Sequence, residues 1–172
     1  MIQLDFKSLF LKISELKKIF KEQGEEDTFS IQFEENENKN MTNLFYQTPQ
    51  MNVDYTRYPD VVFLNKRLAK TRFRRNIVLF CGINSEGKTV VFGVAFLKEE
   101  TQFTYSFAIK SFLSSVKEPP SCFLIERCSQ IKAAFKHDFP HLHLLFCNYN
   151  LHKTLKHQLK GIAAKAGFKE KT

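Results

Sequence analysis

The chain has 172 residues, of which 43% are hydrophobic and 19 are Phe, so it can build one domain with a substantial core. It contains no apolar run of about eighteen residues and no N-terminal signal of basic residues followed by apolar ones, so we expect neither a membrane span nor secretion. The net charge of +8 favours a polyanionic partner. The four cysteines lack paired spacing, and we expect them to be reduced.

The N-terminal part predicts a helix followed by two strands. Apolar residues recur at helical spacing between positions 5 and 23. Phe29–Phe33 alternates with period two, which is typical of a half-buried strand, and Leu44–Tyr46 begins a returning strand. Residues 47–60 contain Pro49 and Pro59, and we expect them to form a loop.

The centre of the chain predicts a buried hairpin and one further strand. Val61–Leu64, Ile77–Ile83 and Val90–Leu97 are short runs rich in Val, Ile and Phe, as strands are. The second and third runs are joined by Asn84–Lys88, a short link with Gly87 near its end. These three runs therefore predict consecutive strands.

Helices and strands alternate after the hairpin. Thr101 is a candidate N-cap for a helix reaching about Val116. The later elements predicted from apolar spacing and Pro positions are a strand at Cys122–Ile125, a helix from Ile131 to Pro140, a strand at Leu142–Phe146 and a helix over 151–162. This order predicts an α/β fold in which a mixed sheet carries flanking helices.

The sequence of the hairpin resembles that of Mutator-like-element (MULE) transposases, which also gave rise to the plant far-red-impaired-response transcription factors. The segment 82–101 reads GINSEGKTVVFGVAFLKEET. It matches the family pattern at Gly82, Asn84, Gly87, Thr89, Val90, Phe92, Gly93, Ala95, Leu97, Glu100 and Thr101. Asn43–Tyr46 and Pro59–Val62 resemble the lead-in of the family, and the similarity runs from about residue 29 to about 155.

The resemblance implies a ribonuclease-H-like mixed sheet of three antiparallel strands followed by alternating helices and strands. Residues 1–50 would be an N-terminal helix and hairpin that lead into the core. Residues 51–172 would be the core itself, incomplete at its C-terminal end. The family also implies a location in the nucleus and a role as a domesticated transposable-element protein.

The chemistry implied by the resemblance uses three carboxylates that hold two Mg²⁺ or Mn²⁺ ions. In this chain the first carboxylate position is Asn65, the second is Glu126, and the third would lie beyond Thr172. The family Cys-x-x-His motif ends here in Asn150. We therefore expect lost catalysis, and Mg²⁺ or Mn²⁺ as cofactor only if activity remains.

Two candidate metal sites have simpler explanations. Glu126 is either a surviving metal ligand or an acid that caps the following helix, and the cap is favoured because the partner carboxylate is missing. A set of potential zinc ligands lacks paired Cys-x-x-Cys spacing and is disfavoured. Its members are His137, His141, His143, Cys147 and His152.

A cluster of basic residues lies between the first and second central strands. It comprises Lys66, Arg67, Lys70, Arg72, Arg74 and Arg75. Clustered Lys and Arg are the groups that bind DNA phosphates, although a solvated hairpin is commonly basic as well. We slightly favour DNA binding.

Three functional hypotheses remain open at this point. The first is a catalytically inactive, transposase-derived domain that binds DNA. The second is a divalent-metal-dependent nuclease or strand transferase that uses Glu126 and acids outside this chain. The third is a protein-interaction scaffold that docks a partner through its N-terminal helix.

Overall fold

The computed structural model describes residues 29–38, 40–68 and 76–147, and the following description concerns these ranges. The predicted helices over 5–23 and 151–162 lie outside them. Within the described ranges no helix is long and apolar enough to cross a membrane. Cys81 is buried, whereas Cys122, Cys128 and Cys147 are half-buried.

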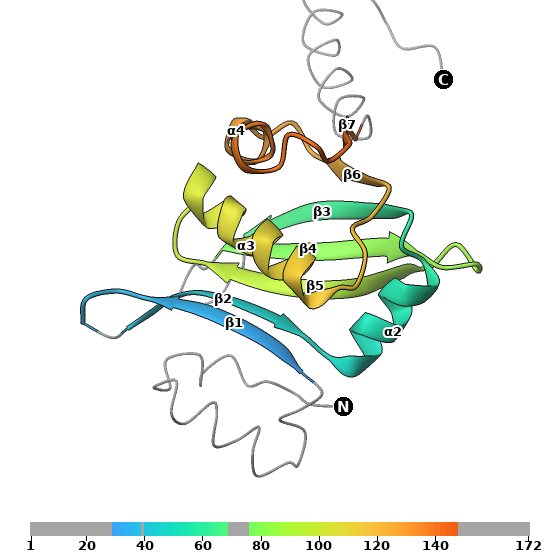
Figure 1. The fold of residues 1–172 in the computed structure, drawn as a ribbon, viewed down its shortest axis with the longest axis horizontal. Coiled ribbons are helices and arrows are strands. Elements are labelled where there is room, and N and C mark those ends of the chain that lie inside the picture. The colour runs from blue at the N-terminus through green and yellow to red at the C-terminus, as the bar shows by residue number, and fades with distance from the viewer. Residues whose placement is uncertain (1–28, 39, 69–75, 148–172) are drawn as a thin grey trace, which may run out of the picture.

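The described strands form one mixed sheet of seven strands (Figure 1). In chain order they are β1 (Ser30–Glu35), β2 (Met41–Gln47), β3 (Val61–Leu68), β4 (Asn76–Ile83), β5 (Thr89–Leu97), β6 (Cys122–Ile125) and β7 (Leu144–Phe146). Their order across the sheet is β1-β2-β5-β4-β3-β6-β7. In this order each strand from β1 through β2, β5 and β4 to β3 is antiparallel to its neighbour. The strand β6 runs parallel to β3, and β7 runs parallel to β6. The predicted α/β class, the mixed sheet and the three central strands are confirmed.

The link between β4 and β5 forms the predicted hairpin turn. The Asn84 side-chain oxygen accepts hydrogen bonds from the backbone N–H groups of Glu86 (3.0 Å) and Lys88 (2.9 Å). Gly87 has a φ of 73°, a left-handed conformation that costs least for glycine. The two turn residues that stood out in the sequence therefore make the turn.

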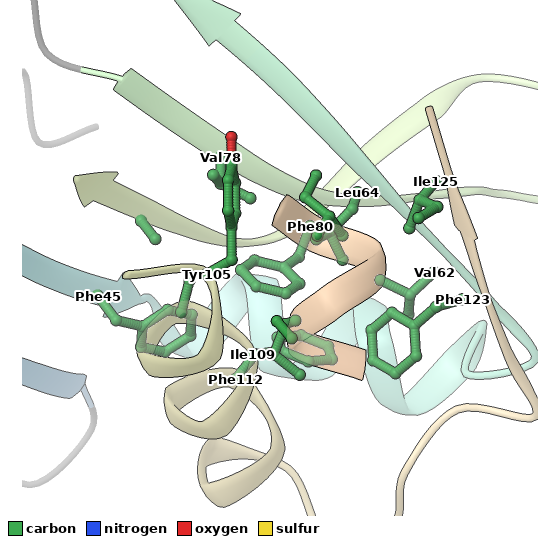
Figure 2. Close-up of a cluster of buried hydrophobic side chains, with 14 of the residues drawn as sticks. Phe45, Val62, Leu64, Val78, Phe80, Tyr105, Ile109, Phe112, Phe123 and Ile125 are labelled. Carbon is green, nitrogen blue, oxygen red and sulfur yellow. The ribbon is translucent and has the colours of Figure 1, made fainter. Parts of the chain in front are cut away.

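The core lies between the sheet and α3 (Gln102–Ser115), which runs across the strands (Figure 1). Phe112 of α3 stacks on Phe80 of β4, with ring centroids 4.5 Å apart and an interplanar angle of 5°. Phe45 and Phe123 meet the Phe112 ring edge-on from β2 and β6. Figure 2 shows this group of buried aromatic and aliphatic side chains. Residues that are far apart in the sequence thus hold α3 on the sheet.

The helices α3 and α4 (Ser129–Asp138) confirm the two helices that were predicted after the hairpin, from Thr101 to about Val116 and from Ile131 to Pro140. Thr101 is the N-cap of α3 and forms a capping box with Thr104. In this box the Thr104 N–H donates to the Thr101 hydroxyl, and the Thr101 N–H donates to the Thr104 hydroxyl. The helix therefore starts at the residue that the sequence indicated.

The predicted loop over residues 47–60 is wrong, because it contains the helix α2 (Pro49–Arg57). The Thr48 hydroxyl caps this helix by accepting a hydrogen bond from the Met51 N–H at 3.1 Å. Pro49 occupies the start of the helix, where its missing N–H is not needed. The prolines that suggested a loop thus mark the ends of a short helix.

Candidate functional site

The pairing of β3 with β6 brings the two family carboxylate positions to the same edge of the sheet. The parallel register runs from Val61 opposite Cys122 to Leu64 opposite Ile125. Asn65 and Glu126 each follow one residue later. The counting that selected them in the sequence therefore selects neighbouring positions on adjacent strands.

The side chains of β3 point alternately to the two faces of the sheet. Leu64 is buried in the core beneath α3, so the next residue, Asn65, points to the opposite face. Lys66 returns to the α3 face, opposite the buried Val78 of β4. Lys66 is thus the polar residue of this strand end that shares a face with α3.

Lys66 forms an ion pair with Glu100, which lies just before α3. The Lys66 ammonium donates to the Glu100 carboxylate over 2.5 Å, and the side chains are 34% and 31% exposed. The hydrogen bond to Glu100 raises the pKa of Lys66 against the opposing effect of partial burial. The charges of Glu100, Cys128 and Glu126 raise this pKa as well. The Lys66 ammonium is therefore stabilised by several acidic groups around it.

Tyr105 of α3 is affected electrostatically by the same groups, Glu100, Glu126 and Cys128. The residue is completely buried, and among the described residues its hydroxyl has no hydrogen-bond partner of acceptable geometry. Its pKa is raised mainly by burial, then by the charges of Cys128 and Glu100, by a hydrogen-bond interaction with the Cys128 thiol, and finally by the charge of Glu126. The Cys128 thiol is thus a polar neighbour of this hydroxyl, although the hydrogen bond between them lacks good geometry. Figure 2 shows the Tyr105 ring within the core cluster. We call Lys66, Glu100, Tyr105, Glu126 and Cys128 the strand-end cluster.

The strand-end cluster is a poor site for Mg²⁺ or Mn²⁺, which need several converging oxygen ligands. No group of three His, Cys, Asp or Glu residues in the described ranges could hold a metal ion. One carboxylate of the cluster, that of Glu100, already faces the Lys66 ammonium. Asn65 contributes no negative charge. These residues therefore do not fit the two ions that the resemblance implied.

The sequence comparisons match this central region to a known family. The model of the MULE transposase domain matches residues 61–154, which is more than half of the chain. The chain belongs to the MULE transposase domain family. Its relatives include two proteins of Arabidopsis thaliana, FAR1-RELATED SEQUENCE 6 and FAR1-RELATED SEQUENCE 5. They are 28% and 26% identical to it over 74% and 75% of this chain, respectively.

The plant protein FAR-RED IMPAIRED RESPONSE 1 is also similar, with 25% identity over 64% of this chain. These alignments cover 18%, 16% and 14% of the three relatives, so the chain spans less than a fifth of their length. The chain is thus a transposase-derived MULE domain related to the FAR1 proteins.

The remaining DNA-binding candidates of this MULE domain lie mainly in the β3–β4 connection. Lys70, Arg72, Arg74 and Arg75 are outside the described residues, as is the side chain of Arg67. The connection leaves β3 at Leu68 and enters β4 at Asn76, and these two residues are paired. This pair lies two residues beyond the Lys66–Val78 pair in the register of β3 and β4. The connection therefore begins and ends close to the strand-end cluster.

Two other interpretations of the sequence, the capping of α4 by Glu126 and a zinc site, are not found in the described residues. No side chain caps α4 by hydrogen bonding, and its N-cap residue is Cys128 rather than Glu126. The zinc candidates in the described ranges form no metal-binding group, and His152 lies outside those ranges. His137 instead contacts the neighbouring Asp138 at 2.8 Å.

Sequence reasoning missed three members of the strand-end cluster, namely Glu100, Tyr105 and Cys128. A signal for Glu100 was present, because this acid belongs to the matched family pattern directly before the Thr101 cap. Tyr105 and Cys128 carried no comparable signal, since a buried aromatic residue and a single thiol are common in cores.

Proposed function

We propose that this MULE domain is a catalytically inactive, ribonuclease-H-like remnant of a transposase that binds DNA through the β3–β4 connection. The observation that carries the proposal is the identity of the residues at the end of β3. An amide, Asn65, occupies the first carboxylate position, and an ammonium, Lys66, faces the acid before α3. Two-metal catalysis needs charged oxygen ligands at such positions.

The sheet order supports the ribonuclease-H-like part of the proposal. The antiparallel strands β5, β4 and β3 are followed across the sheet by β6 and β7, which run parallel to β3. This is the arrangement expected when three antiparallel strands precede alternating helices and strands. The β1–β2 hairpin extends the sheet beyond β5.

The charge of the β3–β4 connection supports DNA binding. Four basic residues occur within Lys70–Arg75, between two paired strands. Such contacts neutralise phosphates and release counterions, so affinity should fall steeply as salt concentration rises. A nuclear location and a host role follow from the same proposal, by analogy with the family.

The experiment is a salt titration of duplex DNA binding by the parent protein and by the triple variant R72A/R74A/R75A. Each lost phosphate contact should lower the slope of log affinity against log salt by about one. The control variant K88A/K117A/K136A removes the same charge from exposed positions elsewhere. Equal slopes in the two triple variants would refute the role of the connection, and no binding by the parent at low salt would favour the protein-scaffold alternative.

Catalytic inactivity has a separate assay. With Mg²⁺ or Mn²⁺, and DNA that carries terminal inverted repeats, the protein should neither nick nor transfer strands. Asn65→Asp alone should not restore cutting, because one added carboxylate does not complete the ligand set. Cutting by the parent that Glu126→Gln abolishes would instead establish the metal-dependent enzyme.

A further inference from the structure

We propose that the N-terminal segment of this chain, residues 5–23, packs as an amphipathic helix on the face of the sheet opposite α3. We call the α3 side the first face and the opposite side the second face. The inference concerns how the sheet is covered and does not depend on DNA binding. The apolar stripe of this segment is then used within the chain rather than for docking a partner protein.

The second face of the sheet is apolar across several strands. Phe45 of β2 lies in the core on the first face, so its neighbour Leu44 points to the second face. The register extends Leu44 into a row of apolar residues, with Phe33 in β1, Phe96 in β5 and Ile77 in β4. A sheet with such residues on both faces is typically covered by other elements on both faces.

Three residues of the second face are buried. Leu44 and Phe96 are each 8% exposed, and Cys81 is 4% exposed. Cys81 is on the second face because it pairs with Phe63, whose neighbour Leu64 points to the first face. None of these three belongs to the cluster of buried residues beneath α3. They therefore form a separate buried group that the core on the first face does not explain.

The described helices do not account for this burial, because all three pack on the first face. Tyr55 of α2 meets Phe112 of α3 edge-on, and Phe135 of α4 lies against Phe123 of β6 with ring centroids 5.0 Å apart. All four residues belong to the core cluster on the first face. A further apolar segment is therefore needed to keep water from the second face.

The N-terminal segment is the favoured occupant because the second face is engaged near β1, where this segment joins the sheet. Phe33, Tyr46, Cys81 and Phe96 each have an interaction partner, and they lie in β1, β2, β4 and β5. Phe29, directly before β1, stacks on Tyr46 with ring centroids 6.0 Å apart. The chain thus approaches β1 along the second face, whereas the segment after β7 joins the sheet at the opposite edge.

The length and the pattern of residues 5–23 fit the second face. A helix over this range would be about 28 Å long, and the six strands from β1 to β6 span about 24 Å. Residues 24–28 can extend over about 17 Å, which is enough to return the chain onto the face. The apolar residues form one stripe, so they can face the sheet while most of the lysines face water. The members of this stripe are Phe6, Leu9, Phe10, Ile13, Leu16 and Phe20.

The first experiment uses the unmodified protein and measures NOEs between methyl groups. We expect NOEs from Ile13 or Leu16 to Ile77, Leu79 or Val94, which the register places on the second face. The absence of all such NOEs would overturn the proposal. NOEs to the same sheet residues from the leucines of residues 151–159 would overturn it as well, since another segment would then occupy the face.

The second experiment measures how fast iodoacetamide alkylates each of the four cysteines, which mass spectrometry locates. Cys81 is the reporter because it is buried on the second face. Ile13→Asp places a carboxylate in the middle of the stripe and should raise the Cys81 rate about tenfold or more, because burial of this charge loosens the packing. The matched control Leu11→Asp adds the same group on the opposite side of the predicted helix and should leave the rate within about twofold of the parent.

Equal Cys81 rates in I13D and L11D would contradict the proposal. A parent rate that changes with protein concentration would also contradict it, because a second copy of the chain would then cover the face. A joint rise at all four cysteines would indicate that I13D unfolds the whole chain. In that case the NOE measurement on the parent protein decides.

Discussion

Two buried tyrosines provide a test of the core because the same substitution should change stability in opposite directions. Tyr55 of α2 is 4% exposed, and Tyr105 of α3 is completely buried. The Tyr55 hydroxyl donates to the Glu118 carbonyl at 2.7 Å, whereas the Tyr105 hydroxyl makes no hydrogen bond of good geometry among the described residues and has only the Cys128 thiol as a polar neighbour. Replacement by Phe removes only the hydroxyl and leaves each ring in place.

Tyr55→Phe should lower the free energy of unfolding by about 1 kcal/mol, the usual net value of one hydrogen bond. Tyr105→Phe should raise it by up to about 1 kcal/mol, because burial of a hydroxyl that makes no hydrogen bond of good geometry is unfavourable, and a thiol such as Cys128 is a weak partner. The two variants would then differ by about 2 kcal/mol, which corresponds to about 4–8 °C in melting temperature for a chain of this size. Chemical denaturation and thermal melting both measure this difference.

The comparison has an internal control in the ring contacts. The Tyr55 ring meets Phe92 and Phe112 edge-on, with centroid distances of 5.4 and 5.3 Å, and both contacts survive the change to Phe. A loss of stability in Y105F equal to that in Y55F would refute the reasoning. It would mean that the Tyr105 hydroxyl makes a hydrogen bond as favourable as that of Tyr55.

Much of the fold could be predicted because apolar runs and turn residues are local signals. The strands β3, β4 and β5 coincide with three runs rich in Val, Ile and Phe. The helix α2 could not be found in this way, because Tyr55 is its only buried residue and no apolar stripe exists. Its start depends on the Thr48 cap and Pro49, which also occur in loops.

The candidate site could be predicted only in part. Counting along the family pattern selected Asn65 and Glu126, and the β3–β6 register makes them neighbours. The Lys66–Glu100 pair depends on how β5 returns to bring the start of α3 beside β3, and no local pattern encodes that contact. The basic residues of the β3–β4 connection are visible in the sequence, but their role as DNA contacts stays a prediction.

The residues that carry the family resemblance mostly have structural roles. Asn84 and Gly87 make the hairpin turn, and Thr101 caps α3. Asn43 is 5% exposed, and its side chain accepts a hydrogen bond from the Lys98 N–H just after β5. Such residues specify the fold without performing chemistry. Family membership can therefore persist in a chain that carries Asn65 where the family resemblance implies a carboxylate.

The remaining predictions concern packing, capping and pH. Gly82→Ala should cost about 1–3 kcal/mol in denaturant unfolding, because a Cβ there would lie 2.2 Å from the buried Phe92 ring; an unchanged midpoint would contradict this packing. Thr101→Ala should cost about 1 kcal/mol in the same assay by removing the α3 cap, and Thr101→Ser should retain most of the stability. Stability should also decrease above about pH 10, where tyrosines of the unfolded chain lose their protons. In the folded chain burial raises the pKa of Tyr55 to about 12 and that of Tyr105 further, because the ionised phenolate is unfavourable in the core. Titration of these two groups therefore leaves stability unchanged below about pH 10 and lowers it as pH rises towards the folded pKa values. The raised pKa of Lys66 acts in the same direction. The double variant Y55F/Y105F should therefore show a weaker alkaline decrease in denaturation midpoint than the parent, and an identical decrease in both proteins would assign the alkaline instability to other groups.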